Sequence, residues 1–218
     1  MTLLWNAAAL VAAYLIGSLS FAVIVSRFMG LSDPRSYGSG NPGATNVLRS
    51  GNKKAAALTL LFDLVKGLVP VALVVLWGHH LGLDETSAAW VGLAACLGHL
   101  WPVFFRFQGG KGVATAAGVL LALSPGLGLA TLLSWALIAA FFRYSSLASI
   151  VAALFAPFFQ LLIWGGGPAL ACIVPMSLLL IWRHEGNIRK LLAGTESRLG
   201  QKAAPPPAPH HPSKGHHR

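Results

Sequence analysis

Three polar segments of this 218-residue chain contain residue types that bind anions, and each lies beside long apolar runs. The first spans residues 39–49, and its candidate ligands are Ser39, Gly40, Asn41, Gly43, Thr45 and Arg49. Glycines let consecutive backbone N–H groups converge on one anion, hydroxyl and amide groups add donors, and a guanidinium binds phosphate through paired hydrogen bonds. The segment is a candidate phosphate site, although a tight linker capped by Asn and Ser would look the same.

The second segment is a glycine loop that leads directly into an apolar helix. Its candidate ligands are Gly109, Gly110, Lys111 and Gly112. A glycine loop followed by a helix N-terminus favours phosphate, because its N–H groups and the helix dipole attract negative charge. The loop is not a Walker A motif, since a glycine follows the lysine where Ser or Thr is required. Nucleotide hydrolysis is therefore not implied, and a plain hairpin is the alternative.

The third segment begins where the last apolar run ends and contains His184 and Asn187. On a continuing helix their i, i+3 spacing puts both on one face, where an imidazole and an amide could orient a polyol. A basic collar at the membrane surface is the alternative. Between the second and third segments, another helix begins with three serines that could cap it or face a substrate: Ser145, Ser146 and Ser149.

Two charged residues, Asp63 and Lys66, lie inside an apolar run. Charged groups at membrane depth are candidates for function, and Lys66 is the one that could contact a substrate. A mutual ion pair at i, i+3 spacing is the structural alternative.

Other kinds of site are disfavoured. There is no Gly-x-Ser-x-Gly nucleophile elbow, and the six carboxylates are too scattered for a two-metal site, so we expect no metal and no cofactor. The formal net charge of +10 would suit nucleic acid. The basic residues stand in short gaps between apolar runs rather than on one face, so no nucleic-acid partner is expected.

The elements that position these segments must lie in a bilayer. Only 10% of the residues are charged, against about 25% in soluble domains. Residues 3–26, 55–77 and 88–105 are each long enough for a span, which needs about 20 apolar residues. Residues 112–142 and 144–182 are longer, and each could form one bent helix or two short ones.

The distribution of Lys and Arg favours two helices in each long stretch, with breaks at Ser124-Pro125-Gly126 and at Gly165-Gly166-Gly167-Pro168. That arrangement puts 15 of the 16 basic residues on one side, and basic residues prefer the cytoplasmic side. We predict an all-α integral membrane protein with about seven transmembrane helices, its amino terminus outside and its carboxyl terminus cytoplasmic. The short helix after residue 112 should be tilted or should start inside the protein.

Residues 1–200 are predicted to form a single membrane-embedded domain. Residues 201–218 form a low-complexity tail rich in Pro and His, a composition typical of disorder.

Four segments together resemble a known family. They begin at Ser39 (Ser-Gly-Asn-Pro-Gly-Ala-Thr-Asn-Val-Leu-Arg), at Asp63 (Asp-Leu-Val-Lys-Gly), at Gly98 (ending in Gly-Gly-Lys-Gly) and at His184 (His-Glu-Gly-Asn-Ile-Arg-Lys-Leu-Leu-x-Gly-x-Glu, ending at Glu196). In this order they resemble the bacterial acyl-phosphate:glycerol-3-phosphate acyltransferases, the PlsY family, over residues 4–200. The resemblance implies a seven-helix enzyme of the bacterial inner membrane whose active site faces the cytoplasm.

The resemblance also implies a reaction. A fatty acyl group passes from acyl phosphate to the 1-hydroxyl of sn-glycerol 3-phosphate, giving 1-acyl-sn-glycerol 3-phosphate (lysophosphatidic acid) and inorganic phosphate, the first acylation of phospholipid synthesis. The implied partners are these two substrates, membrane lipids and a separate enzyme that forms acyl phosphate. No cofactor is implied.

Matching the family motifs assigns catalytic roles to Ser39, Arg49, Lys111, His184 and Asn187, and substrate binding to Gly40, Asn41, Gly43, Thr45, Lys66, Gly109, Gly110, Gly112 and Ser149. Because acyl phosphate is already activated, the protein must mainly hold two anions together and stabilise developing charge. A phosphate monoester with a second pKa near 6 can itself accept the hydroxyl proton, so we expect substrate-assisted catalysis. A transporter of phosphate or another small anion is the alternative, but the internal repeat typical of carriers is not found.

Overall fold

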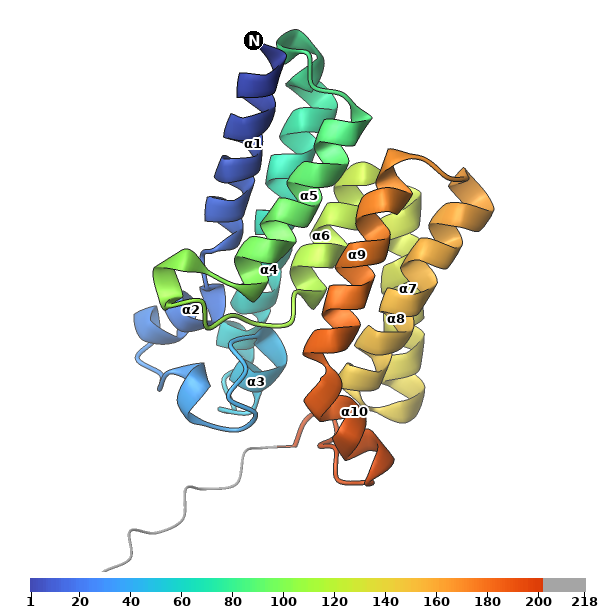
Figure 1. The fold of residues 1–218 in the computed structure, drawn as a ribbon. Helices are drawn as coiled ribbons and strands as arrows, with labels where there is room; N and C mark the ends of the chain where they lie inside the picture. The colour runs from blue at the N-terminus through green and yellow to red at the C-terminus, as the bar shows by residue number, and fades with distance from the viewer. Residues whose placement is uncertain (202–218) are drawn as a thin grey trace, which may run out of the picture.

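The computed structural model describes residues 1–201, and every regular element in that range is helical, which confirms the predicted all-α class (Figure 1). The α-helices are α1 (Thr2–Gly17), α2 (Phe21–Phe28), α3 (Ala44–Leu48), α4 (Lys53–Trp77), α5 (Glu85–Leu100), α6 (Val113–Leu123), α7 (Pro125–Phe142), α8 (Ser145–Phe159), α9 (Pro168–Arg183) and α10 (Glu185–Leu192). Three 3-10 turns, η1 (Pro34–Ser36), η2 (Gly78–Leu81) and η3 (Val103–Phe105), and a π turn, η4 (Gln160–Trp164), lie between them. Except for Gln201, the predicted tail lies outside the described residues.

The first apolar run differs from the single helix expected over residues 3–26. It forms α1 and α2, which meet at a bend of 44°. The backbone leaves the helix at Ser18, whose hydroxyl donates to the Tyr14 carbonyl at 2.8 Å. The carbonyl of Leu19, freed by the break, accepts a hydrogen bond from Lys66 at 2.7 Å. A helix can be interrupted within a membrane protein when other groups satisfy the freed backbone in this way.

Both long apolar stretches divide into two helices at the breaks that their turn residues predict. α6 ends at Leu123, the Ser124 hydroxyl accepts from the Leu127 amide at 3.4 Å, and Pro125 opens α7. In the second stretch, the glycines at 165 and 167 have positive φ angles of 80° and 133°, and Pro168 opens α9. Glycine adopts these angles without a steric penalty, and proline suits the first turn of a helix because its missing N–H is not needed there.

Glycines allow the helices to pack closely. A Cβ added to Gly98 of α5 would overlap the Tyr14 carbonyl oxygen of α1, and one added to Gly118 of α6 would overlap the Leu64 carbonyl oxygen of α4. Small residues at such crossings bring helix backbones together, which is how helices associate in lipid, where the hydrophobic effect provides no drive. The contacts join α1 to α5 and α4 to α6.

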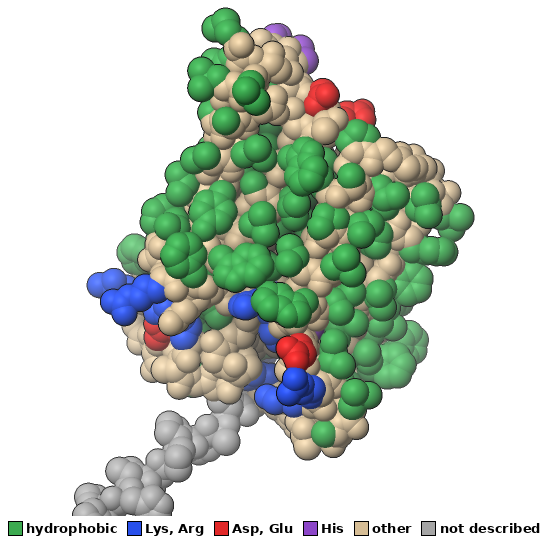
Figure 2. Space-filling model, in the orientation of Figure 1, with side chains coloured by type: hydrophobic (Ala, Val, Ile, Leu, Met, Phe, Trp, Pro, Cys, Tyr) green, Lys and Arg blue, Asp and Glu red, His purple; other side chains and the backbone are tan. Residues whose placement is uncertain are grey.

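Within residues 1–201, four helices are long and apolar enough to cross a membrane: α4 with η2, α5 with η3, α7, and α8 with η4. The bent pair of α1 and α2 gives a fifth candidate, while α6 and α9 are shorter apolar helices. Figure 2 shows apolar side chains over the flank of the molecule, and Lys and Arg side chains gathered at the end where α2, α3 and α10 lie. The amino terminus lies at the opposite end (Figure 1).

Candidate functional site

A cavity of about 270 Å³ opens among α3, α4 and α6 to α10 at the basic end of the molecule. It is lined by ten of the predicted site residues: Ser39, Asn41, Gly43, Thr45, Arg49, Lys111, Gly112, Ser149, His184 and Asn187. The structure thus brings together side chains from all three polar segments and from the serine cluster of α8. Gly40, Gly109, Gly110 and Lys66 do not line the cavity.

The segment of residues 39–49 is folded around a buried amide, that of Asn46. Its Nδ2 donates to the carbonyls of Pro34 at 2.6 Å and Tyr37 at 3.2 Å, and its Oδ1 accepts from the Ser39 amide at 3.0 Å. Sequence reasoning assigned Asn46 no role, since an amide that ties a loop and one that binds a ligand look alike in sequence. The network holds Ser39 and Arg49 at the same cavity wall.

Lys111 extends from the glycine loop before α6 to the other side of the cavity. Its ammonium donates to the Oδ1 of Asn187 on α10. Burial lowers the pKa of Lys111 to about 8, reinforced by Arg49 and opposed in part by the Glu196 carboxylate. Lys111 therefore carries its positive charge at neutral pH in a site shielded from water, where an anion would bind strongly.

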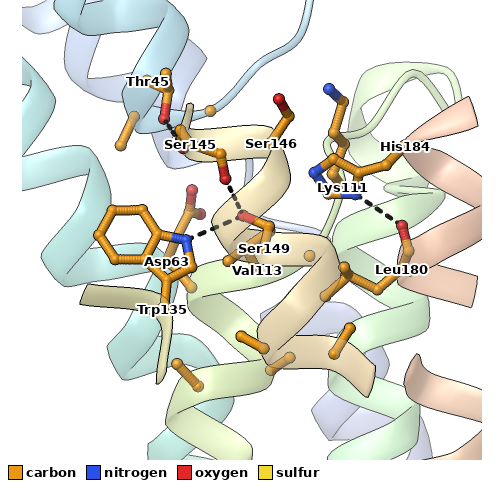
Figure 3. A pocket seen from close by; sticks show the side chains of 18 of the residues that line it. Thr45, Asp63, Lys111, Val113, Trp135, Ser145, Ser146, Ser149, Leu180 and His184 are labelled. Atoms are coloured by element: carbon orange, nitrogen blue, oxygen red, sulfur yellow. Dashed lines mark hydrogen bonds between the residues drawn. The ribbon is translucent and has the colours of Figure 1, made fainter. Parts of the chain in front are cut away.

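His184 is buried between α9 and α10, and its Nδ1 donates to the Leu180 carbonyl at 2.8 Å (Figure 3). Burial and the positive charge of Lys111 lower the pKa of His184 to about 4. The ring is therefore neutral at pH 7, with its proton on Nδ1 and a lone pair on Nε2. That lone pair can accept a hydrogen bond from a substrate hydroxyl.

The three serines of α8 all line the cavity, and each has a different partner. Ser145 pairs with the Thr45 hydroxyl at 3.1 Å. Ser149 donates to the Ser145 carbonyl at 2.7 Å and accepts from the Trp135 indole at 3.1 Å (Figure 3). Ser146 donates to Glu196 at 2.7 Å. The sequence left open which of the three serines faces the substrate, and in the structure all three line the same cavity.

The segment after α10, residues 193–201, contributes Glu196, Ser197 and Leu199 to the cavity lining. Its Glu196 carboxylate accepts from the Asn187 amide at 2.7 Å as well as from Ser146, and its Ser197 hydroxyl accepts from Arg49. Glu196 and Ser197 line the cavity but were not among the predicted site residues. Glu196 ends the last of the four family motifs, and that position was the sequence signal for its place in the site.

Lys66, predicted to bind substrate, does not itself line the cavity, but its partner Asp63 does. Its ammonium lies 2.8 Å from the Asp63 carboxylate, and both side chains are almost fully buried. Its hydrogen bond to the Leu19 carbonyl supports the bend between α1 and α2. The contacts are those of the structural alternative, the mutual ion pair.

Beyond the polar end, the cavity continues as an apolar arm between α6, α7, α8 and α9. The arm is lined by Val113, Ala116, Ala117, Leu120, Leu132, Ala152, Ala153, Ala156, Met176 and Leu180. Small alanines on α6 and α8 leave space between the helices for an extended apolar group. The site therefore joins a positively charged end to a hydrocarbon-like one.

Two other kinds of reactive site would be a His-Asp pair and a metal site. His79 and Asp84 have a His-x-x-x-x-Asp spacing, which another class of acyltransferase uses, but neither lines the cavity, and Asp84 caps α5 by accepting from the Ser87 amide at 2.9 Å. Among the described residues, no three His, Cys, Asp or Glu side chains are grouped so that they could hold a metal ion.

Comparison with known proteins decides the family. The family profile described as glycerol-3-phosphate acyltransferase matches residues 7–194. The chain belongs to the PlsY family of glycerol-3-phosphate acyltransferases. Among its relatives, the glycerol-3-phosphate acyltransferase of Burkholderia lata is 66% identical over 197 residues, covering 89% of this chain and 91% of the relative. That of Ralstonia nicotianae is 65% identical over 195 residues, covering 89% and 94%.

Solved PlsY structures share the fold. A crystal structure of PlsY in its glycerol 3-phosphate form, described as an integral membrane protein, is 41% identical, with a TM-score of 0.83 over 89% of this chain and 96% of that one. The lysophosphatidic acid form is 40% identical, with a TM-score of 0.81 over 88% and 94%. This PlsY-family chain is therefore a multi-pass membrane protein and an acyltransferase, as its sequence motifs predicted.

Proposed function

We propose that this protein transfers a fatty acyl group from acyl phosphate to the 1-hydroxyl of sn-glycerol 3-phosphate, releasing 1-acyl-sn-glycerol 3-phosphate and inorganic phosphate. The observation that carries the proposal is the joined cavity, whose basic end contains Arg49, Lys111 and His184 and whose other end is apolar. One substrate has a phosphate and a hydrocarbon chain, and the other has a phosphate and hydroxyls. A site for both needs these two kinds of surface in contact.

The positive groups suit two phosphates held close together. Arg49 and Lys111 lie on different walls of the cavity and can neutralise two anions whose mutual repulsion would otherwise keep the substrates apart. Acyl phosphate is a mixed anhydride, so its phosphate leaves readily once its charge is stabilised. Holding the reacting hydroxyl near the carbonyl then provides much of the remaining acceleration.

The proton acceptor in this proposal is the phosphate of glycerol 3-phosphate. A phosphate monoester with a second pKa of about 6 is largely dianionic at neutral pH. His184 and Asn187 orient the glycerol, with the His184 Nε2 lone pair accepting a hydroxyl hydrogen bond. The hydroxyl oxygen attacks the acyl carbon, the carbon–oxygen bond to phosphate breaks, and the hydroxyl proton passes to the substrate phosphate.

The proposed topology has seven spans, formed by the bent pair α1 and α2 and by α4 to α9. It places the amino terminus outside and the basic end, with the cavity, in the cytoplasm of a bacterial cell at the inner membrane. The gathering of Lys and Arg at one end supports this orientation (Figure 2).

Single cysteines introduced at the exposed positions Ser50 and Thr86 test this orientation. A membrane-impermeant maleimide added to intact spheroplasts should label Thr86→Cys and leave Ser50→Cys unlabelled. Labelling of Ser50→Cys alone would reverse the orientation.

The reaction is tested with purified protein in lipid. Palmitoyl phosphate is supplied with and without glycerol 3-phosphate, released phosphate is measured, and lysophosphatidic acid is identified by mass spectrometry. Phosphate release that requires glycerol 3-phosphate and matches product formation supports the proposal. Product from palmitoyl-CoA but not from palmitoyl phosphate would mean that the acyl donor is acyl-CoA rather than acyl phosphate. Uptake of phosphate into vesicles without any product would favour the transporter.

A further inference from the structure

The loop that carries Lys111 has no regular secondary structure, yet Lys111 must be held in place to act on a phosphate. Residues 109–112 lie between η3 and α6, outside any helix. Glycine backbones are the most mobile in a chain, so a loop with three glycines around its lysine loses much conformational freedom when it is ordered. Contacts from outside the loop must offset this cost.

One set of contacts comes from the end of α5. The Gly110 amide donates to the His99 carbonyl at 3.1 Å. A Cβ added to Gly109 would overlap the His99 carbonyl oxygen, and one added to Gly110 would overlap the His99 ring. The two glycines are therefore required for the loop backbone to lie directly against His99.

The opposite side of the loop is held by Arg183, the last residue of α9. Its Nε donates to the Gly110 carbonyl at 3.1 Å and its Nη2 to the Gly109 carbonyl at 2.9 Å. A guanidinium is a rigid planar fork, so two bonds to adjacent carbonyls fix the peptide between them in both position and orientation. Arg183 does not line the cavity, so its hydrogen bonds hold the backbone of the loop rather than a ligand in the site.

Arg183 also joins two parts of the site that lie far apart in the chain. The residue after it is His184, and the residue after Gly110 is Lys111, although the two pairs are 73 residues apart. Asn187, which accepts from Lys111, lies one helical turn beyond His184. The guanidinium therefore ties the backbone that carries Lys111 to the backbone that carries His184 and Asn187.

We propose that Arg183 is a positioning residue for the acyl transfer: its forked hydrogen bonds to the Gly109 and Gly110 carbonyls hold the Lys111 ammonium in register with His184 and Asn187. This inference rests on the proposed function and adds a residue to its machinery. Arg183 acts only through Lys111, so its contribution disappears when Lys111 is absent.

A double-mutant cycle tests this dependence, with Arg183→Ala, Lys111→Ala and the double variant assayed for kcat and KM in lipid. Arg183→Ala should lower kcat/KM roughly tenfold to a hundredfold, the range expected when a catalytic group is displaced by about 1 Å. In the Lys111→Ala background the same change should have little further effect. Losses that multiply in the double variant would mean that Arg183 acts independently, and wild-type kinetics in Arg183→Ala would overturn the proposal.

Two further variants separate positioning from charge and from folding. Arg183→Lys keeps the positive charge but replaces the fork with a single-point donor, so it should recover only part of the loss. Arg189→Ala removes the same charge from an exposed position on α10, where Arg189 pairs with Glu185, and should stay within about twofold of wild type. Full activity in Arg183→Lys would show that charge alone is needed, and an equal loss in Arg189→Ala would assign the effect to net charge.

Thermal unfolding and calorimetric binding of glycerol 3-phosphate are measured on every variant. If Arg183→Ala does not fold, the cycle is run with Arg183→Lys in its place. Failure of the proposed function would appear as absence of product from the wild-type protein with palmitoyl phosphate. Failure of the positioning role would appear as an active wild type whose Arg183 variants bind and turn over normally.

Discussion

The Lys111 ammonium donates to the Asn187 amide oxygen, and this bond links a loop before α6 to α10, 76 residues later in the chain. The other side of the same Asn187 amide donates to Glu196 at 2.7 Å. Lys111, Asn187 and Glu196 thus form one chain of polar contacts across the cavity. A phosphate entering the site meets a lysine that is already oriented.

Removing the lysine should damage catalysis without unfolding the protein. Lys111→Ala is expected to raise KM and to lower kcat about 100-fold or more, the usual cost of losing one group that stabilises developing negative charge. Lys54→Ala is the matched control, since Lys54 is exposed at the start of α4 and does not line the cavity. Steady-state kinetics with phosphate release as the readout check both variants, and unchanged kinetics in Lys111→Ala would remove the lysine from the mechanism.

Activity should decline in alkali because Lys111 loses its charge. The pKa of Lys111 is lowered to about 8, so the protonated form, which binds phosphate, disappears as pH rises through that value. The profile of kcat/KM reports groups of the free enzyme and should fall above about pH 8. Lys111→Arg keeps its charge in this range and should be less active but lack the alkaline fall. A fall that persists in Lys111→Arg would assign it to another group.

The acidic side of the profile should follow the substrate rather than His184. The pKa of His184 is lowered to about 4, so the ring is neutral throughout the range in which glycerol 3-phosphate loses its second proton, near pH 6. We expect kcat/KM to rise through about pH 6, and His184→Gln to lower the rate while the rise stays at the same pH. If His184→Ala abolished turnover at saturating substrate but left substrate affinity intact, a histidine base would be the better account.

The apolar arm should determine which acyl chains are accepted. Ala153 of α8 lines the arm and is buried, so Ala153→Phe should shorten the space and lower turnover of palmitoyl phosphate about tenfold relative to octanoyl phosphate. The adjacent Leu154 is 57% exposed on the outer face of α8, and Leu154→Phe should leave the ratio unchanged. Competition between the two donors, with products separated by mass spectrometry, measures the ratio. Equal losses for both donors in Ala153→Phe would place the acyl chain elsewhere.

Much of the helical framework could be predicted because its signals are local. The breaks before Pro125 and Pro168 follow from turn residues whose backbone preferences act within a few positions. The break at Ser18 was missed, because the residues around it are apolar or small and have no such signal. It depends on Lys66, a residue 47 positions from Leu19, which satisfies the freed carbonyl.

The sequence by itself determined that this chain lies in a membrane, that it is helical, and which three polar segments could bind phosphate. Composition and the residue types of each loop are sufficient for these conclusions, since burial in lipid and anion binding depend on chemistry that each segment carries alone. Only the tertiary structure decided which members of those segments meet. It paired Lys66 with Asp63, brought Glu196 to Asn187, and set Arg183 on the glycine loop. Such contacts join residues far apart in the chain, so they depend on how whole helices pack rather than on any local pattern.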